Sequence, residues 1–126
     1  MSVCLGLGAL VVALEAERFT LAWTHSVEHT RWEEDWRAAD GRLVLEAARV
    51  QGSGAGMEVP DGAIRRGAFW QWHPDLPPQD ALTLGRSAAV PPYTLCVEGA
   101  CRSVDAILGD PSGEDPARLW ACPGRE

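Results

Sequence analysis

The chain has 126 residues, of which 46% are hydrophobic, and its formal net charge at pH 7 is −7. This length suits a single domain with its own core, and the hydrophobic content excludes an intrinsically disordered chain. All 11 basic residues are arginines, scattered among 18 acidic residues. The sequence therefore lacks the concentrated positive charge of proteins that bind nucleic acids or anionic membranes, and we expect no nucleic-acid partner.

The N-terminal part contains two short apolar runs, residues 3–7 and 10–14, separated by a glycine-containing turn. They are too short for a membrane span of about 20 residues. A secretory signal peptide begins with positive charge, whereas no basic residue precedes Arg18. We therefore predict two buried strands, a protein that does not span the membrane, and a cytoplasmic location, with a degenerate leader peptide as the alternative.

Residues 19–27 and 32–38 are predicted to form two further strands. Aromatic and β-branched side chains alternate with polar ones in the first, and apolar side chains alternate with charged ones in the second. One face of the second strand is therefore solvated. Its opposite, inward face carries Trp32, Glu34, Trp36 and Ala38.

An Asp-Gly dipeptide follows directly and predicts a tight hairpin that leads into a return strand over residues 43–50. A two-residue hairpin loop places Trp32 opposite Arg49 across the strand pair. Arg49 then becomes a diagonal neighbour of the inward Glu34, close enough for the two side chains to interact.

The rest of the chain alternates short apolar segments with Gly- and Pro-rich turns, and no long helical periodicity occurs. The segments predicted as strands are residues 64–73, 81–84, 93–97 and 102–108. We therefore predict an all-β fold, a small antiparallel β-sandwich or barrel, in one domain over residues 1–108. Residues 109–126 are rich in Pro, Gly and Asp and are expected to form a poorly ordered tail, which Trp120 could dock back onto the domain.

The four cysteines are Cys4, Cys96, Cys101 and Cys122. Without an export signal, we expect them to be reduced, and the sequence does not choose among the possible pairings. Cys96 and Cys101 flank a hairpin-like turn, so these two side chains can face each other across a strand pair. The cysteine spacing does not suit a zinc site, which favours a structural or incidental role.

One short motif suggests metal chemistry, because His25, Glu28 and His29 match the H-x-x-E-H pattern of a zinc peptidase class. That motif binds zinc from a helix, whereas the residues before it alternate as in a strand. We therefore predict no metal ion and no cofactor. Ser26 adjoins His25, but neighbours on a strand point to opposite faces, so the two do not form a catalytic pair.

Glu34 is the most informative residue of the inward face, because it lies between Trp32 and Trp36. A carboxylate among indole rings is unfavourable unless it is paired. Burial would raise its pKa and a nearby arginine would lower it. Glu34 is therefore interpreted either as a ligand-binding or proton-transfer group, or as half of an ion pair with Arg49 or Arg66 that fixes the strand register.

A glycine-rich loop, QGSGAG, follows the return strand and permits a tight turn or a close backbone approach. It lacks the lysine and the following helix of a phosphate-binding loop. We combine it with the polar and aromatic residues above into one candidate binding site. The candidate residues are His25, Ser26, Glu28, Trp32, Glu34, Arg49, Gly52, Gly54 and Gly56.

The stretch FTLAWTHSVEHTRWEEDW, followed by LVLEAARVQGSGAGM and GAFWQWHP, resembles the bacterial and archaeal family called domain of unknown function 1850. The resemblance covers residues 19–74, with a weaker match over residues 95–108. The family has no established reaction, and its members often occur beside TRAP transporters with TAXI-type solute receptors. The resemblance implies an accessory role near solute uptake, with a transporter component or its small-molecule solute as partner. Many relatives carry a hydrophobic leader, so a periplasmic or membrane-associated location is the alternative to the cytoplasm.

Three hypotheses for function follow. The first is an accessory ligand- or protein-binding module linked to a TAXI-type TRAP solute transporter, and this is the one we favour over an enzyme. The second is a hydrolase that uses His25 with Glu28 or Glu34. The third is a purely structural module, in which the polar cluster only fixes strand register.

Overall fold

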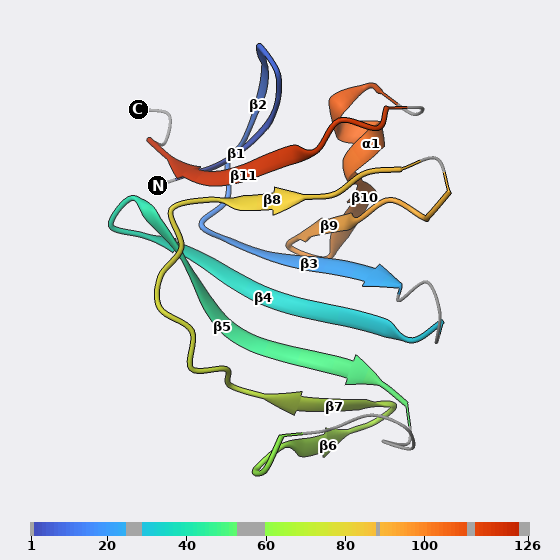
Figure 1. Ribbon diagram of the computed structural model, residues 1–126. Coiled ribbons are helices and arrows are strands. Elements are labelled where there is room, and N and C mark those ends of the chain that lie inside the picture. Colours follow the sequence, from blue (N-terminus) through green and yellow to red (C-terminus); the bar gives the residue numbers. More distant parts are fainter. Residues whose placement is uncertain (1, 25–28, 53–59, 88, 111–112, 124–126) are drawn as a thin grey trace.

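Two antiparallel β-sheets form the fold in the computed structural model, which describes residues 2–24, 29–52, 60–87, 89–110 and 113–123 (Figure 1). One sheet has four strands in the order β2-β1-β11-β8, and the other has seven in the order β10-β9-β3-β4-β5-β7-β6. The smaller sheet crosses one end of the larger sheet, and β4, β5 and β7 extend beyond it. The predicted all-β, sandwich-like fold is confirmed.

The four-stranded sheet joins segments from both ends of the chain. Its strands are β1 (Ser2–Leu7), β2 (Leu10–Leu14), β8 (Leu82–Leu84) and β11 (Ala117–Cys122). The first two match the apolar runs that the sequence predicted as strands. The expected burial is wrong for β2, in which Leu10 and Val11 are exposed. Val3 and Leu5 of β1 and Leu119 of β11 are completely buried, because they face the larger sheet.

The seven-stranded sheet is built around three long strands, β3 (Arg18–Thr24), β4 (Arg31–Ala39) and β5 (Arg42–Gln51). The sequence predicted the first two from their alternation and the third as the return strand after the Asp40-Gly41 hairpin turn. Shorter strands continue the sheet on both sides. These are β6 (Ile64–Arg66), β7 (Phe69–Trp72), β9 (Thr94–Val97) and β10 (Ala100–Ser103).

Two predicted strands turn out to be divided. Residues 64–73 form a hairpin of β6 and β7, because Gly67 has a positive φ of 60° and reverses the chain. Residues 102–108 form the end of β10 and then a helix, α1 (Val104–Leu108). The Ser103 side chain caps this helix by accepting a hydrogen bond from the Ala106 backbone N–H. No helix in the described part of the chain is long and apolar enough to cross a membrane.

The segment expected to be a poorly ordered tail, residues 109–126, contains strand β11. This strand lies between β1 and β8, and its Ala117 and Leu119 side chains are completely buried. Most of the Pro, Gly and Asp residues on which the expectation rested precede the strand in the sequence. Trp120 packs against the backbone of β1 at Gly6, where its indole ring occupies the space that a Cβ atom would need.

Two disulfide bonds, Cys4–Cys122 and Cys96–Cys101, correct the expectation of reduced thiols. The first joins β1 to β11, at opposite ends of the chain. The second crosses the β9–β10 hairpin, in which Cys101 pairs directly with Cys96, as the turn between them suggested. The described residues contain no free cysteine.

Candidate functional site

An extra residue in β5 divides the predicted site between the two faces of the larger sheet. Asp35 pairs with Ala47, but the next residue of β4, Trp36, pairs with Leu45, so that Glu46 is a β-bulge. The side chains of β5 that follow the bulge therefore change face. The buried positions accordingly move from Leu43 and Leu45 to Ala48 and Val50.

The bulge corrects the predicted pairing of Glu34 with Arg49. Trp32 lies opposite Val50, whereas Arg49 lies opposite Glu33 and points to the outer face of the sheet. A shift of one residue in register exchanges the two faces of a strand, and the predicted hairpin lacked this shift. Arg49 and Glu34 therefore do not belong to one site.

On the outer face, Arg49 is held by two carboxylates. Its two Nη atoms donate to the carboxylate of Asp35 at 2.8 and 2.7 Å, and its Nε donates to Glu33 at 2.7 Å. Arg31 also donates to Glu33 at 2.7 Å, and Thr20 donates to Asp35 at 2.7 Å. We call this set of residues the outer charge cluster.

The outer charge cluster neutralises its own charges. Burial by itself raises the pKa of Glu33 and of Asp35, but hydrogen bonds from the arginines outweigh it, so both pKa values lie below their usual range. The hydrogen bond to Asp35 in turn raises the pKa of Arg49. Because each member already has protein partners, the cluster is better suited to holding β3, β4 and β5 together than to binding a ligand.

The inner face carries a row of aromatic side chains in sequential contact. The rings of Trp23 and Trp32, which pair across β3 and β4, stack with centroids 6.2 Å apart. Tyr93 contacts Trp23 at 5.7 Å, and Trp72 meets Trp32 edge-on at 6.2 Å. We call Tyr93, Trp23, Trp32 and Trp72 the aromatic row. It connects four separate segments of the larger sheet.

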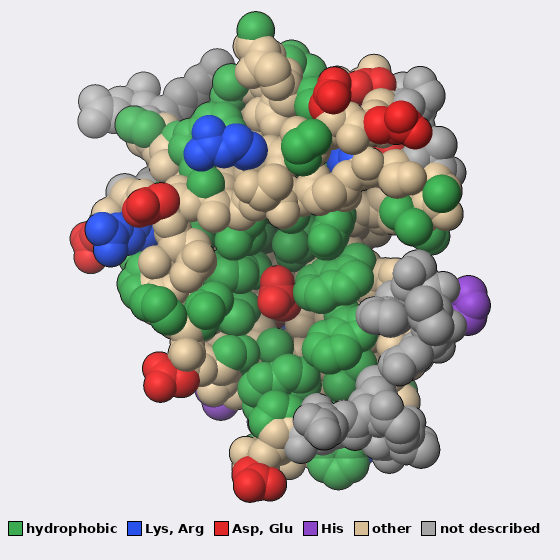
Figure 2. Space-filling view, in the orientation of Figure 1, with side chains coloured by type: hydrophobic (Ala, Val, Ile, Leu, Met, Phe, Trp, Pro, Cys, Tyr) green, Lys and Arg blue, Asp and Glu red, His purple; other side chains and the backbone are tan. Residues whose placement is uncertain are grey.

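Glu34 lies beside this row, in a hollow of about 300 Å³ between the larger sheet and the segment that leads into β8. We call this hollow the Glu34 cleft. Figure 2 shows acidic atoms within a hydrophobic band on this side of the molecule. The side chains that matter for its chemistry are Leu21, Trp23, Glu34, Gln79, Thr83 and Tyr93.

The carboxylate of Glu34 is not neutralised by a basic side chain. Its Oε1 accepts a hydrogen bond from Trp36 Nε1 at 3.2 Å, and no ion pair in the described part of the chain includes it. Burial therefore raises the pKa of Glu34, and the hydrogen bond from Trp36 lowers it by less. The pKa of Tyr93 is raised by burial and by the negative charge of Glu34. The predicted ion pair with Arg49 or Arg66 does not form.

Two indole groups near the aromatic row lack a hydrogen-bond acceptor. The Nε1 atoms of Trp32 and Trp70 are buried, and neither has a partner among the residues that the structure describes. A buried donor without an acceptor is unfavourable by about 1–3 kcal/mol. The inner face thus combines an unpaired carboxylate with unused donors, which are both features of a binding surface.

Of the remaining predicted residues, the structure describes Gly52 alone. His25, Ser26, Glu28, Gly54 and Gly56 lie outside the described residues, so their part in the site stays a prediction. The described glycine of the loop, Gly52, donates its backbone N–H to the carbonyl of Ala68 at 3.0 Å and so joins β5 to the β6–β7 hairpin. In the described part of the chain, no group of three His, Cys, Asp or Glu residues is placed to hold a metal ion.

Sequence reasoning included Trp32 and Glu34 but missed Trp23, Trp72 and Tyr93 as parts of the site. The inward alternation of Trp23 was a usable signal, since it lies on the same face as Leu21. Tyr93 had no local signal, because its place beside Trp23 depends on the pairing of β9 with β3.

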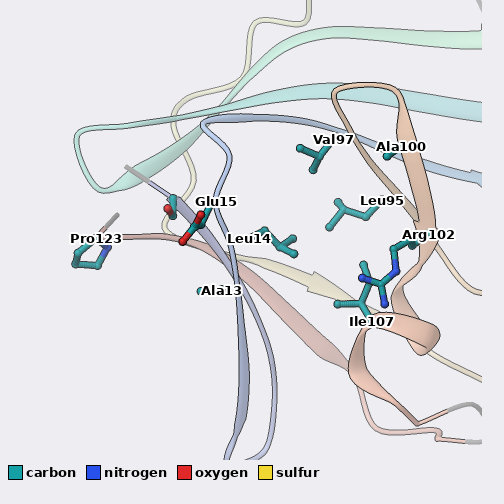
Figure 3. A pocket seen from close by; sticks show the side chains of 10 residues that line it. Ala13, Leu14, Glu15, Leu95, Val97, Ala100, Arg102, Ile107 and Pro123 are labelled. Carbon is teal, nitrogen blue, oxygen red and sulfur yellow. The ribbon is translucent and has the colours of Figure 1, made fainter. Parts of the chain in front are cut away.

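A larger hollow, of about 750 Å³, lies between β2, β9, β10 and α1 (Figure 3). The apolar side chains of Leu14, Leu95, Val97 and Ile107 surround it, with Glu15 and Arg102 at its sides. None of the predicted site residues that the structure describes lines it.

A family model described as "Domain of unknown function (DUF1850)" matches residues 19–104, which is more than half of the chain. The matched region contains the Glu34 cleft, the aromatic row and the outer charge cluster. It excludes β1, β2 and β11, and hence part of the wall of the larger hollow. No curated protein and no solved structure matches the chain.

Proposed function

The chain belongs to the DUF1850 family, and we propose that it is a binding module whose ligand occupies the Glu34 cleft. The observation that carries this proposal is a half-buried carboxylate without a basic partner in the described structure, beside a row of aromatic rings. Such a group is unfavourable for folding, and sites that destabilise the fold are often kept for function. The matched region includes every member of the site.

The purely structural hypothesis receives less support from the same geometry. It required an ion pair between Glu34 and an arginine to fix the strand register, and that pair is absent. The ion pairs across β4 and β5 lie on the other face, where Arg49 contacts Glu33 and Asp35. Glu34 does accept the indole hydrogen bond of the buried Trp36, but that contact needs only an acceptor oxygen, which a glutamine would also supply, so it does not explain a carboxylate at this position.

We also propose that the ligand or partner belongs to a TAXI-type TRAP transporter, either its solute or its solute receptor. The resemblance of residues 19–74 to a family found beside such transporters supports this assignment. The size of the cleft, about 300 Å³, suits a small molecule at the lower end of the range for ligand pockets.

For the location we propose the periplasm in place of the cytoplasm. Two disulfide bonds support it, because such bonds persist in oxidising compartments and are rare in the cytosol. Cell fractionation combined with thiol alkylation tests this proposal. Recovery of the protein in the cytoplasmic fraction with four alkylated cysteines would contradict it.

Hydrolysis is the second candidate function, and the raised pKa of Glu34 favours it, since a buried carboxyl group with a raised pKa can act as a general acid. His25 and Glu28 are the other residues that the sequence analysis proposed for hydrolysis. This candidate predicts that His25→Ala abolishes an activity and leaves the thermal stability unchanged. Equal loss of folding in that variant would assign His25 a structural role instead.

The binding proposal is tested with the purified, oxidised protein. Tryptophan fluorescence is followed while transporter solutes and the solute receptor are added, because Trp23 and Trp32 flank the cleft. Glu34→Gln should weaken binding, and Glu17→Gln is the matched control, since Glu17 is exposed on the outside of the sheets. Absence of binding to every solute and to the receptor, in both redox states, would exclude the proposal.

A further inference from the structure

The described walls of the Glu34 cleft carry a negative charge but no basic side chain. Its only charged side chain among the described residues is the carboxylate of Glu34, and no arginine lines it. In the adjoining hollow, the one charged residue among the described lining is Arg86, which is buried and bound to Asp105 at 2.9 Å and to the backbone carbonyls of Asp110 and Asp115. The cleft is therefore a site of negative potential with no counter-ion supplied by these walls.

Two aromatic rings stand beside this carboxylate. Trp23 and Tyr93, whose centroids are 5.7 Å apart at an angle of 54°, line the same hollow as Glu34. The faces of such rings attract cations. One face of Trp23 is stacked on Trp32, so the cation–π contact would come from the parts of Trp23 and Tyr93 that line the hollow. Gln79 and Thr83 add polar atoms on the opposite wall.

We propose that the Glu34 cleft binds a small organic ammonium ion, with the positive group against Glu34 and the alkyl part against Trp23 and Tyr93. This inference rests on the proposed binding function and specifies the class of ligand. Each element of the site contributes: the carboxylate supplies the missing ion pair, the rings supply cation–π contact, and Leu21 supplies an apolar floor.

Other classes of ligand fit less well. An anion would meet the unpaired carboxylate of Glu34 with no basic side chain to offset the repulsion. Calcium and magnesium ions prefer six or more oxygen ligands, whereas the cleft offers one carboxylate among its described residues. A neutral molecule could fill the space, but it would leave the charge of Glu34 buried and unpaired.

The test compares choline with 3,3-dimethyl-1-butanol, a neutral molecule of nearly the same shape. Both are titrated into the oxidised protein, and binding is followed by tryptophan fluorescence and by calorimetry. We expect choline to bind at least about tenfold more tightly than the neutral molecule. Calcium chloride is titrated as a separate probe and is expected not to compete with choline.

Two variants test whether residues of the cleft cause the preference for choline over its neutral analogue. Glu34→Gln should weaken choline binding by at least about tenfold and leave binding of the neutral molecule unchanged, while Glu17→Gln should change neither. Trp23→Leu should weaken choline binding. Its denaturation curve should show that the variant still folds. A retained fold in each variant is checked by circular dichroism, so that loss of binding is not loss of structure.

Failure of the ammonium assignment and failure of the binding function would give different experimental results. Equal affinity for choline and its neutral analogue, or choline binding that survives Glu34→Gln, would overturn the ammonium assignment and leave a binding cleft of another specificity. Competition by calcium ions would replace it with a metal site. If choline, its analogue, the transporter solutes and the solute receptor all fail to bind, both the ammonium assignment and the binding function are overturned.

Discussion

Glu34 and Arg49 lie on opposite faces of one sheet, although Glu34 pairs with Ala48, the residue directly before Arg49. The bulge at Glu46 turns the arginine toward Asp35 and Glu33 and leaves the carboxylate of Glu34 without a basic partner in the described structure. One extra residue in β5 thus creates both a self-neutralised outer surface and an inner cleft that carries negative charge. The predictions below test each side of this arrangement.

The first prediction concerns the free energy of unfolding that the protein loses by burying the charged side chain of Glu34. Because burial raises its pKa in the folded protein, folding favours the protonated form, and this contribution is lost as the pH rises through the folded pKa. Glu34→Gln should therefore increase the free energy of unfolding near neutral pH by about 0.5–1 kcal/mol, a range reduced for the exposed part of the side chain. Urea denaturation measures this change.

The pH dependence of this effect provides a check. Below the ordinary glutamate pKa of about 4.3, Glu34 is protonated in both the folded and the unfolded states, so the difference between the two proteins should disappear. A Glu34→Gln variant that is less stable than the original protein at neutral pH would show that the carboxylate stabilises the fold.

The second prediction concerns Arg49. Its removal leaves Asp35 and Glu33 without their shared partner, and Arg49→Met should reduce the free energy of unfolding by about 1–2 kcal/mol. Arg42→Met is the matched control, because the Arg42–Asp80 pair is exposed, and it should have little effect. Equal effects of the two substitutions would contradict a stabilising role for the outer charge cluster.

The same cluster should govern the loss of stability in acid. The pKa values of Glu33 and Asp35 are lowered in the folded protein, so their contribution is present above their ordinary pKa values and is lost as the pH falls through the lowered ones. Denaturation across this acidic range should show a smaller decline for Arg49→Met than for the original protein.

The third prediction compares the two disulfide bonds. Cys4 and Cys122 are 118 residues apart, whereas Cys96 and Cys101 are 5 apart. In the chain-entropy description, the longer loop contributes about 2–3 kcal/mol more stability. Replacing Cys4 and Cys122 by alanine should therefore lower the free energy of unfolding more than the same replacement of Cys96 and Cys101, and equal losses would oppose this explanation.

The fourth prediction tests the packing of β11 on β1. A Cβ atom added at Gly6 would lie 2.7 and 2.8 Å from two ring carbons of Trp120, closer than real contacts allow. Gly6→Ala should reduce the free energy of unfolding by about 1–3 kcal/mol. Gly85→Ala is the control, because nothing lies within 4 Å of a Cβ at that position. Thermal denaturation distinguishes the two variants.

The Asp40-Gly41 hairpin signal was sufficient to predict β5 as the return strand, and alternation in the sequence was sufficient to predict β3 and β4, because each has one buried face and one polar face. It was not sufficient to predict the bulge, since Glu46 has no local feature that marks it as an extra residue. The error of one position then placed Arg49 beside Glu34. Register in the middle of a long hairpin depends on packing against the second sheet, which local sequence does not contain.

Two other errors had signals that were available in the sequence. Ser103 followed by Asp105 is a helix start, with a capping hydroxyl and an acidic first turn, and α1 begins there. In residues 117–122 the apolar side chains of Ala117 and Leu119 alternate with Arg118, but the Pro and Gly residues before them dominated the interpretation. The contact of Tyr93 with Trp23 is different, because it arises only when β9 pairs with β3.

The pairing of β1 with β11 has a consequence for biosynthesis. A chain is made from its N-terminus, so β1 is synthesised long before its partner at residues 117–122 exists. The seven-stranded sheet can assemble in the meantime, and Cys96 and Cys101 can meet soon after both are made. The Cys4 thiol must wait for Cys122, and during that interval it can be oxidised with the wrong cysteine. Correct maturation therefore depends on oxidation that is slower than the completion of the chain.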